Sequence, residues 1–96
     1  MNHEVELFLG RSFTKIVDAV AYEYIEKDNV VIVIVAAGDH TDEVYEEMLR
    51  IEQEAMDRFC DFSFDFHVWS HQGRGSSSVI PKRYKLVYPP PFKEGS

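Results

Sequence analysis

Apolar residues in the first quarter of the chain recur with the spacing of a single helix face. Through residues 13–25 they stand at positions i, i+3, i+4 and i+7, and Ser12 is placed to cap a helix that begins there. The same phase continues backwards past Gly10 into residues 4–9, which also alternate like a short strand. The pattern favours one long helix with a flaw at Gly10, because a glycine inside a helix costs only about 1 kcal/mol relative to alanine. A strand at residues 4–9 is the alternative.

The next apolar run, residues 30–37, contains only Val, Ile and Ala and follows the turn residues Lys27-Asp28-Asn29. A strand without a polar face is typical of a sheet that is covered on both sides. Residues 44–59 then show a second amphipathic helix with a Glu-rich outer face, and a strict alternation follows from Phe62. Because a strand, a helix and a strand in succession form a parallel pair with a right-handed crossover, these elements predict a βαβ unit.

A last strand, residues 80–88, follows a Gly/Ser-rich loop and is predicted to pair antiparallel with the strand that begins at Phe62. The pattern as a whole predicts an α+β two-layer sandwich, with a small mixed sheet and two helices on one face. Its order is α-β-α-β-β, or β-α-β-α-β-β if residues 4–9 form a strand. One domain covers residues 1–88, and a Pro-rich tail follows at 89–96 because proline cannot donate to a sheet ladder.

The alternation assigns side chains to the two faces of the sheet. Those expected to face the helices are Phe62, Phe64, Phe66, Val68, Tyr84, Leu86 and Tyr88. Those expected on the outer face are Asp65, His67, Trp69, Arg83, Lys85 and Val87. Since opposite charges on neighbouring strands contribute about 0.2–1 kcal/mol, the simplest interpretation of Asp65 is that it neutralises Arg83 or Lys85.

The charges divide the chain into an acidic body and a basic end. The chain has 96 residues and a net charge of −7, with 5 Lys or Arg against 16 Asp or Glu in residues 1–70 and a net charge of +4 in residues 71–96. This balance argues against nucleic acid or an anionic membrane as a partner. The single cysteine, Cys60, and the lack of a signal-like start or a long apolar segment predict a cytoplasmic protein.

An outer sheet face that mixes Val and Ile with Trp69 and charged residues is typical of an interface. The leading hypothesis is therefore a small acidic interaction module without enzymatic activity or a cofactor. It would cover its outer face by self-association, as a homo-oligomer, or by binding another protein. The residues assigned to this interface are Val31, Val33, Val35, Trp69, Arg83, Lys85 and Val87.

The alternative is an enzyme or small-ligand domain that acts on an anionic substrate. Residues i and i+2 of a strand lie roughly 6.6 Å apart on one face, so Asp65 would orient His67 as an acid/base while Arg74 binds the anion. With His71 or His40 as a third ligand, the same pair would hold a divalent metal, although the neighbouring Arg and Lys residues oppose a cation.

Two further segments have structural interpretations. Residues 38–43 join a strand to a helix, but their carboxylates oppose phosphate, so Asp39 or Thr41 is expected to cap the helix. Cys60 stands between Phe59 and Phe62, where a small buried side chain is a better interpretation than a nucleophile.

Overall fold

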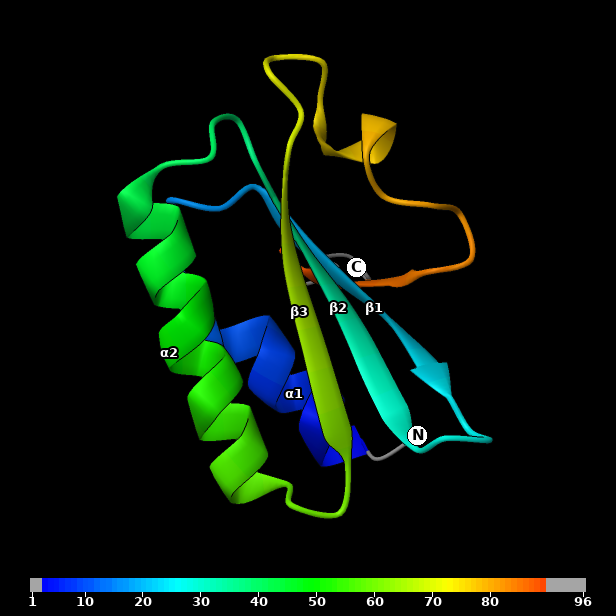
Figure 1. Cartoon of the computed structure of the whole chain (residues 1–96). Coiled ribbons are helices and arrows are strands. Elements are labelled where there is room, and N and C mark those ends of the chain that lie inside the picture. The colour runs from blue at the N-terminus through cyan, green and yellow to red at the C-terminus, as the bar shows by residue number, and fades with distance from the viewer. Residues whose placement is uncertain (1–2, 90–96) are drawn as a thin grey trace, which may run out of the picture.

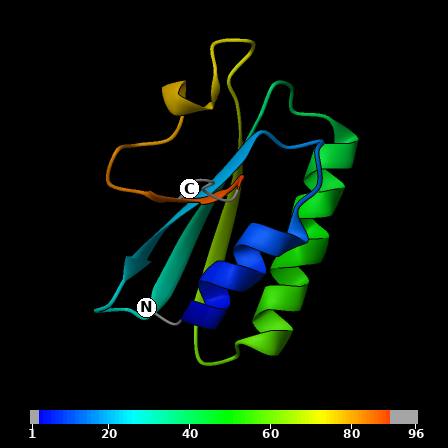
Figure 2. The ribbon, with the colours of Figure 1, turned by 180° about the vertical axis from the view of Figure 1, so that it is seen from behind.

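The computed structural model describes residues 3–89, so residues 90–96 of the predicted tail lie outside the described part of the chain. In chain order the elements are α1 (His3–Ser12), β1 (Ala19–Ile25), β2 (Val30–Ala37), α2 (Asp42–Arg58), β3 (Ser63–Ser70), the short 3₁₀ helix η1 (Ser76–Ser78) and β4 (Lys85–Tyr88). Both long helices cover one face of the sheet, as seen from in front in Figure 1 and from behind in Figure 2. The predicted α+β two-layer architecture is confirmed.

The four strands form one mixed sheet in the order β3-β2-β1-β4. The parallel pair of β2 and β3 is confirmed, with α2 as the crossover between them. The antiparallel pair of β1 and β2 is a hairpin closed by residues 26–29, where Asn29 takes a positive φ of 56°. The predicted pairing of the last strand with the Phe62 strand is wrong, because β4 pairs antiparallel with β1 at the opposite edge.

The largest difference from the sequence prediction lies in residues 13–25, which do not form a helix. Helix α1 ends at Ser12, a turn follows, and Ala19–Ile25 form β1. Ser12 is therefore not an N-cap; its hydroxyl donates to the Phe8 carbonyl oxygen at 2.7 Å within α1. The periodicity is misleading because both faces of β1 are partly buried, so apolar residues occur on both sides of the strand.

The core lies between the sheet and the two helices. From the strands it receives Val20, Tyr22, Val31, Val33, Val35, Phe64, Phe66 and Val87. From the helices it receives Val5, Phe8, Leu9, Val44, Met48, Ile51 and Ala55. The outer-face interface predicted for Val31, Val33, Val35 and Val87 is therefore misplaced, because these side chains are buried under the helices. The outer side chains of β2 are the alternate ones, which the unbroken apolar run could not distinguish.

Helix α2 begins where the sequence predicts. The Thr41 hydroxyl accepts a hydrogen bond from the Val44 N–H at 3.2 Å, and acidic residues occupy the first turn. Both features satisfy or complement the free N–H groups at a helix N-terminus. The capping interpretation of residues 38–43 is confirmed. The expectation that Cys60 is buried is wrong, because its side chain is exposed.

In strand β4 the side chains point to the faces of the sheet opposite to those predicted. Leu86 stands beside Ala21 on the outer side, while Lys85 stands beside Tyr22 on the helix side. Gly10 of α1 lies so close to β4 that a β carbon there would be 2.8 Å from the Val87 carbonyl oxygen. Gly10 is thus the point of closest approach between α1 and β4, and not a flaw in a longer helix.

Candidate functional site

The outer face of β3 is exposed, as the alternation predicts. Asp65, His67 and Trp69 project from it, and Trp69 is 50% exposed. Beside His67 and Trp69, on β2 and β1, the outer sheet face is different, because four strand residues there are buried although they point away from the helices. They are Ala19, Ala21, Ile34 and Ala36. The connection from β3 to β4, residues 71–84, starts at this end of the sheet (Figure 1), and its first side chain, His71, is buried there.

His71 attaches that connection to the sheet. Its side chain is buried, its Nδ1 accepts the N–H groups of Gly73 and Gly75 at 3.2 and 3.3 Å, and its Nε2 contacts the Asp18 carboxylate. Because Nδ1 is the acceptor, Nε2 carries the proton and donates to Asp18. Both ring nitrogens are therefore engaged, and His71 is not placed to ligate a metal beside Asp65.

The predicted acid/base pair does form a contact. His67 Nε2 lies 3.1 Å from Asp65 Oδ2, and both side chains are about half exposed. Arg74, the predicted anion clamp, belongs to the connection beyond β3 and is exposed there. Within residues 3–89, no group of three His, Cys, Asp or Glu side chains is arranged to hold a metal ion.

Neither basic residue that was expected to neutralise Asp65 does so. Arg83 Nε lies 3.0 Å from Glu23 Oε2, and Lys85 Nζ lies 2.9 Å from Glu6 Oε2. This expectation fails because β4 is at the far edge of the sheet, with β1 and β2 between it and β3. The basic end of the chain is thus partly neutralised within the same molecule.

Glu6 also accepts a hydrogen bond from the Tyr22 hydroxyl, so its carboxylate joins α1 to both β1 and β4. Burial by itself raises the pKa of Glu6, but the hydrogen bonds from Lys85 and Tyr22 outweigh it and bring the pKa below the ordinary 4.5. Burial, together with the hydrogen bond to Glu6, raises the pKa of Tyr22.

Glu6→Gln should therefore lower the free energy of unfolding near neutral pH. The variant should also lose less stability than the wild type when the solution is made acidic. A carboxyl group whose pKa is lowered by folding stabilises the fold above its unfolded pKa, and this contribution disappears as the pH falls through the folded-state value. Urea unfolding of the variant and the wild type, from neutral pH down to below the pKa of Glu6, measures the effect. Parallel stability curves for the two proteins would contradict it.

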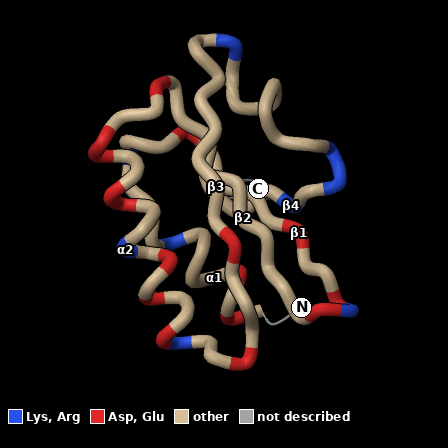
Figure 3. The backbone as a smooth tube through the Cα atoms, in the orientation of Figure 1, with Lys and Arg blue, Asp and Glu red and all other residues tan. Residues whose placement is uncertain are grey.

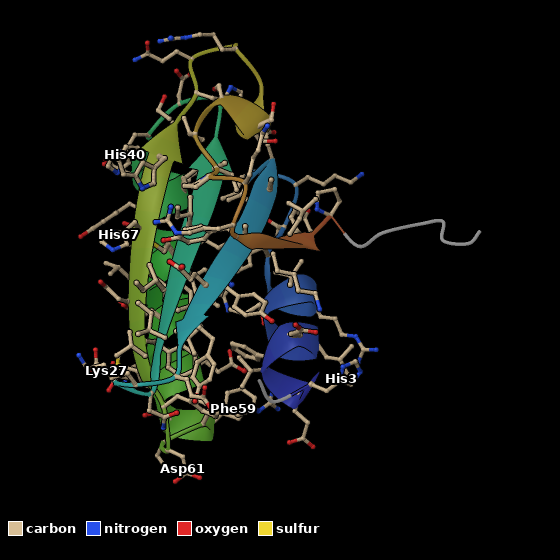
Figure 4. All side chains as sticks on the ribbon, turned by 90° about the vertical axis from the view of Figure 1, so that its right-hand side faces the viewer. His3, Lys27, His40, Phe59, Asp61 and His67 are labelled. Atoms are coloured by element: carbon tan, nitrogen blue, oxygen red, sulfur yellow. The ribbon has the colours of Figure 1, made fainter. Side chains whose placement is uncertain are left out.

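A groove of about 460 Å³ runs along the free edge of β3. Its lining comes from both faces of that strand, from the neighbouring side of α2 and from the turn before α2: His40, Tyr45, Met48, Leu49, Glu52, Phe66, His67, Val68 and Trp69. Three large residues in it are strongly exposed, namely Tyr45, Leu49 and Trp69. Figure 4 shows His40 and His67 beside this edge of the sheet.

Among residues 3–89, the backbone of β3 has no pairing partner on the groove side apart from one contact. The Ser63 N–H donates to the Asn29 carbonyl oxygen before β2, and the His71 N–H donates to the Ala37 carbonyl oxygen at the end of β2. The odd-numbered residues of β3 thus face β2, and the even-numbered ones direct their N–H and C=O groups to the free edge. One of these, the Phe66 N–H, donates to the Glu52 carboxylate at 3.3 Å. A side chain of α2 therefore occupies the middle of an otherwise open strand edge.

A second groove, also of about 460 Å³, lies between α1 and α2 and includes Leu7, Phe8, Glu54 and Arg58. The Arg58 guanidinium stands over the Phe8 ring, 5.4 Å from its centroid. This contact already gives the cation a partner, so the β3 groove is the stronger candidate for a functional site.

Comparison with known proteins leaves the function open. No protein-family model matches the chain, and the search of curated proteins finds no significant similarity. In the described part of the chain, neither helix has the length and apolar character needed to cross a membrane.

Proposed function

We propose that this protein is a non-enzymatic interaction module that binds a partner polypeptide in the β3 groove. The observation that carries the proposal is the gathering of Tyr45, Leu49 and Trp69, all more than 40% exposed, around an unpaired strand edge. Exposed aromatic and aliphatic side chains beside a groove are typical of protein-binding surfaces. The groove replaces the outer sheet face as the docking surface.

Two features of the fold support this change of surface. Four apolar residues of the outer sheet face, Ala19, Ala21, Ile34 and Ala36, are already buried within the chain, so they need no external partner. In the part of the chain that the structure describes, the outer edge of β3 has no neighbouring strand, and Trp69 stands beside it. Edge strands are the positions at which another chain can add to a sheet.

Leu49→Asn and Trp69→Ala should weaken polypeptide binding without unfolding the protein. A central aromatic anchor is typically worth about 2 kcal/mol or more, so Trp69→Ala should weaken binding about thirty-fold. The test is selection of binders from a random peptide display library by the wild-type protein, followed by affinity measurements on both variants. Circular dichroism checks that each variant is folded.

Leu7→Asn is the matched control, because Leu7 is 39% exposed and Leu49 is 42% exposed, but Leu7 belongs to the other groove. We expect this variant to bind the selected peptides like the wild type. Failure to select any peptide would oppose the proposal. Selected peptides that bind Trp69→Ala and wild type equally well would place the docking surface elsewhere.

A further inference from the structure

We infer that the polypeptide bound in the β3 groove is an extended basic segment, which adds to the free edge of β3 as a fifth strand. The inference rests on the proposed function and specifies the chemistry of its partner. Three observations carry it: the open backbone edge, the position of Glu52 on that edge, and the distribution of charge around the groove.

The backbone edge sets the conformation of the partner. The N–H and C=O groups of Phe64, Phe66 and Val68 point away from β2, and a strand is the one regular structure that can pair with such a row. The apolar side chains of the groove stand on both sides of this row, because Phe66 and Val68 belong to one face of β3 and Trp69 to the other. An incoming strand would therefore contact both faces with its alternating side chains.

Charge sets the composition of the partner. Helix α2 contains seven Asp or Glu residues and two Arg residues, and Glu52 projects from it into the groove. Asp65 adds a further carboxylate on β3. Figure 3 shows mostly acidic positions along α2, with basic positions at the tip of the 71–84 connection above β3 and near β4 at the other edge of the sheet. Lys or Arg side chains of a bound strand would meet the acidic side.

Glu52 connects these two requirements. In the free protein its carboxylate accepts the Phe66 N–H, which gives this part-buried edge group a partner. When a strand pairs with β3, a carbonyl oxygen of the partner takes over the Phe66 N–H. The carboxylate is then released, and a Lys or Arg of the same partner pairs with it.

A second copy of the chain fits the edge less well. Two β3 edges in contact would bring Glu52 and Asp65 of one copy towards the same carboxylates of the other, and like charges across an interface are repelled. Contact between β3 and the basic β4 edge of another copy would be heterologous and would continue into filaments. Charged side chains at an edge are also a known protection against self-pairing.

The test uses synthetic peptides of defined composition. The probe is a ten-residue peptide of alternating Lys and Val; its counterparts alternate Glu and Val, or carry N-methyl groups on alternate residues of the Lys/Val sequence. We expect the Lys/Val peptide to shift the amide resonances of Phe64, Phe66 and Val68 and to slow their hydrogen exchange. The N-methylated and acidic peptides should bind at least about ten-fold more weakly, because they lack the backbone donors or the charge.

Glu52→Gln should lower the affinity for the Lys/Val peptide about five-fold and lessen the salt dependence of its binding. Glu43→Gln is the control with the same change in net charge, since Glu43 is exposed on α2 but does not line the groove. Equal effects of the two substitutions would mean that the net charge of the domain attracts the basic peptide. That result would contradict a direct contact between the peptide and Glu52.

The outcomes separate this inference from the proposed function. Library peptides that need Trp69 but are acidic or helical would overturn the basic strand and leave the interaction module intact. Equal binding of the Lys/Val peptide and its N-methylated form would overturn strand addition. A wild-type dimer that persists in sedimentation at high micromolar concentration and is lost in Trp69→Ala would make the occupant a second copy.

Discussion

Val33→Lys should leave the protein unfolded at room temperature. Val33 is completely buried under the helices, in the middle of the central strand β2. The substitution removes about 2 kcal/mol of apolar burial and places an ammonium group where its desolvation costs several kcal/mol more. A domain of this size has a total stability of only about 5–10 kcal/mol. Circular dichroism and the dispersion of amide resonances would show the loss of structure.

Ile32→Lys is the matched control, one residue away on the opposite face. Ile32 is half-buried, and its neighbours across the strands are Glu23 and Asp65. A lysine there keeps its ammonium group in water beside two carboxylates, so we expect a loss of only about 1 kcal/mol. A folded Val33→Lys variant, or equal damage from both substitutions, would show that the register of β2 is reversed.

Gly10→Ala should lower the free energy of unfolding by about 1–2 kcal/mol, against the usual helix propensity. Alanine in a helix is favoured over glycine by about 1 kcal/mol, so helix formation alone predicts a gain. At Gly10 the new β carbon would meet the Val87 carbonyl oxygen at 2.8 Å, and either α1 or β4 has to move. Urea unfolding followed by circular dichroism measures the sign as well as the size of the change.

Gly38→Ala is the corresponding control. A β carbon at Gly38 has the His71 Cε1 atom as its nearest neighbour, at an ordinary distance of 3.9 Å. We expect this variant to be as stable as the wild type or slightly more stable, because alanine restricts the unfolded chain. A gain of stability in Gly10→Ala similar to that in Gly38→Ala would mean that α1 does not press against β4.

The part of the fold that was predictable from sequence is the βαβ unit. Its strands and helix each carry a local signal: a β-branched run in β2, a capped amphipathic pattern in α2 and strict alternation in β3. The alternation also places Asp65, His67 and Trp69 correctly, because one face of β3 is exposed and the other is buried. Local periodicity is informative where a strand or helix has one polar side.

The remaining elements depend on contacts that local periodicity does not contain. The first four residues of β1 are buried on both faces of the sheet, so its apolar spacing also fits a helix. The hairpin signal was present in the turn at residues 26–29, between two runs rich in β-branched and aromatic residues. The position of β4 was not encoded locally, because either edge of the sheet was open to it.

The candidate site was predicted only in part for the same reason. Trp69 projects from the exposed face of β3 as the alternation predicts, but the proposed groove also needs Tyr45, Leu49 and Glu52 from α2. Tyr45 and Leu49 are one turn apart, and they widen the apolar face of α2 beyond what the core uses. This excess of apolar residues on one flank of the helix was the available signal. The other side of the groove, the free edge of β3, could be identified only from the order of the strands in the sheet.

The sheet order also fixes the sequence in which the fold can be completed. The β1–β2 hairpin joins neighbouring segments, and β3 is added after one helix, but β4 pairs with β1 across some sixty intervening residues. During synthesis the hairpin and the βαβ unit can assemble early, while one side of β1 waits for residues 85–88. The contacts of Lys85 with Glu6 and of Val87 with Gly10 join the two ends of the domain. The attachment of the first helix is therefore complete only when the last strand arrives.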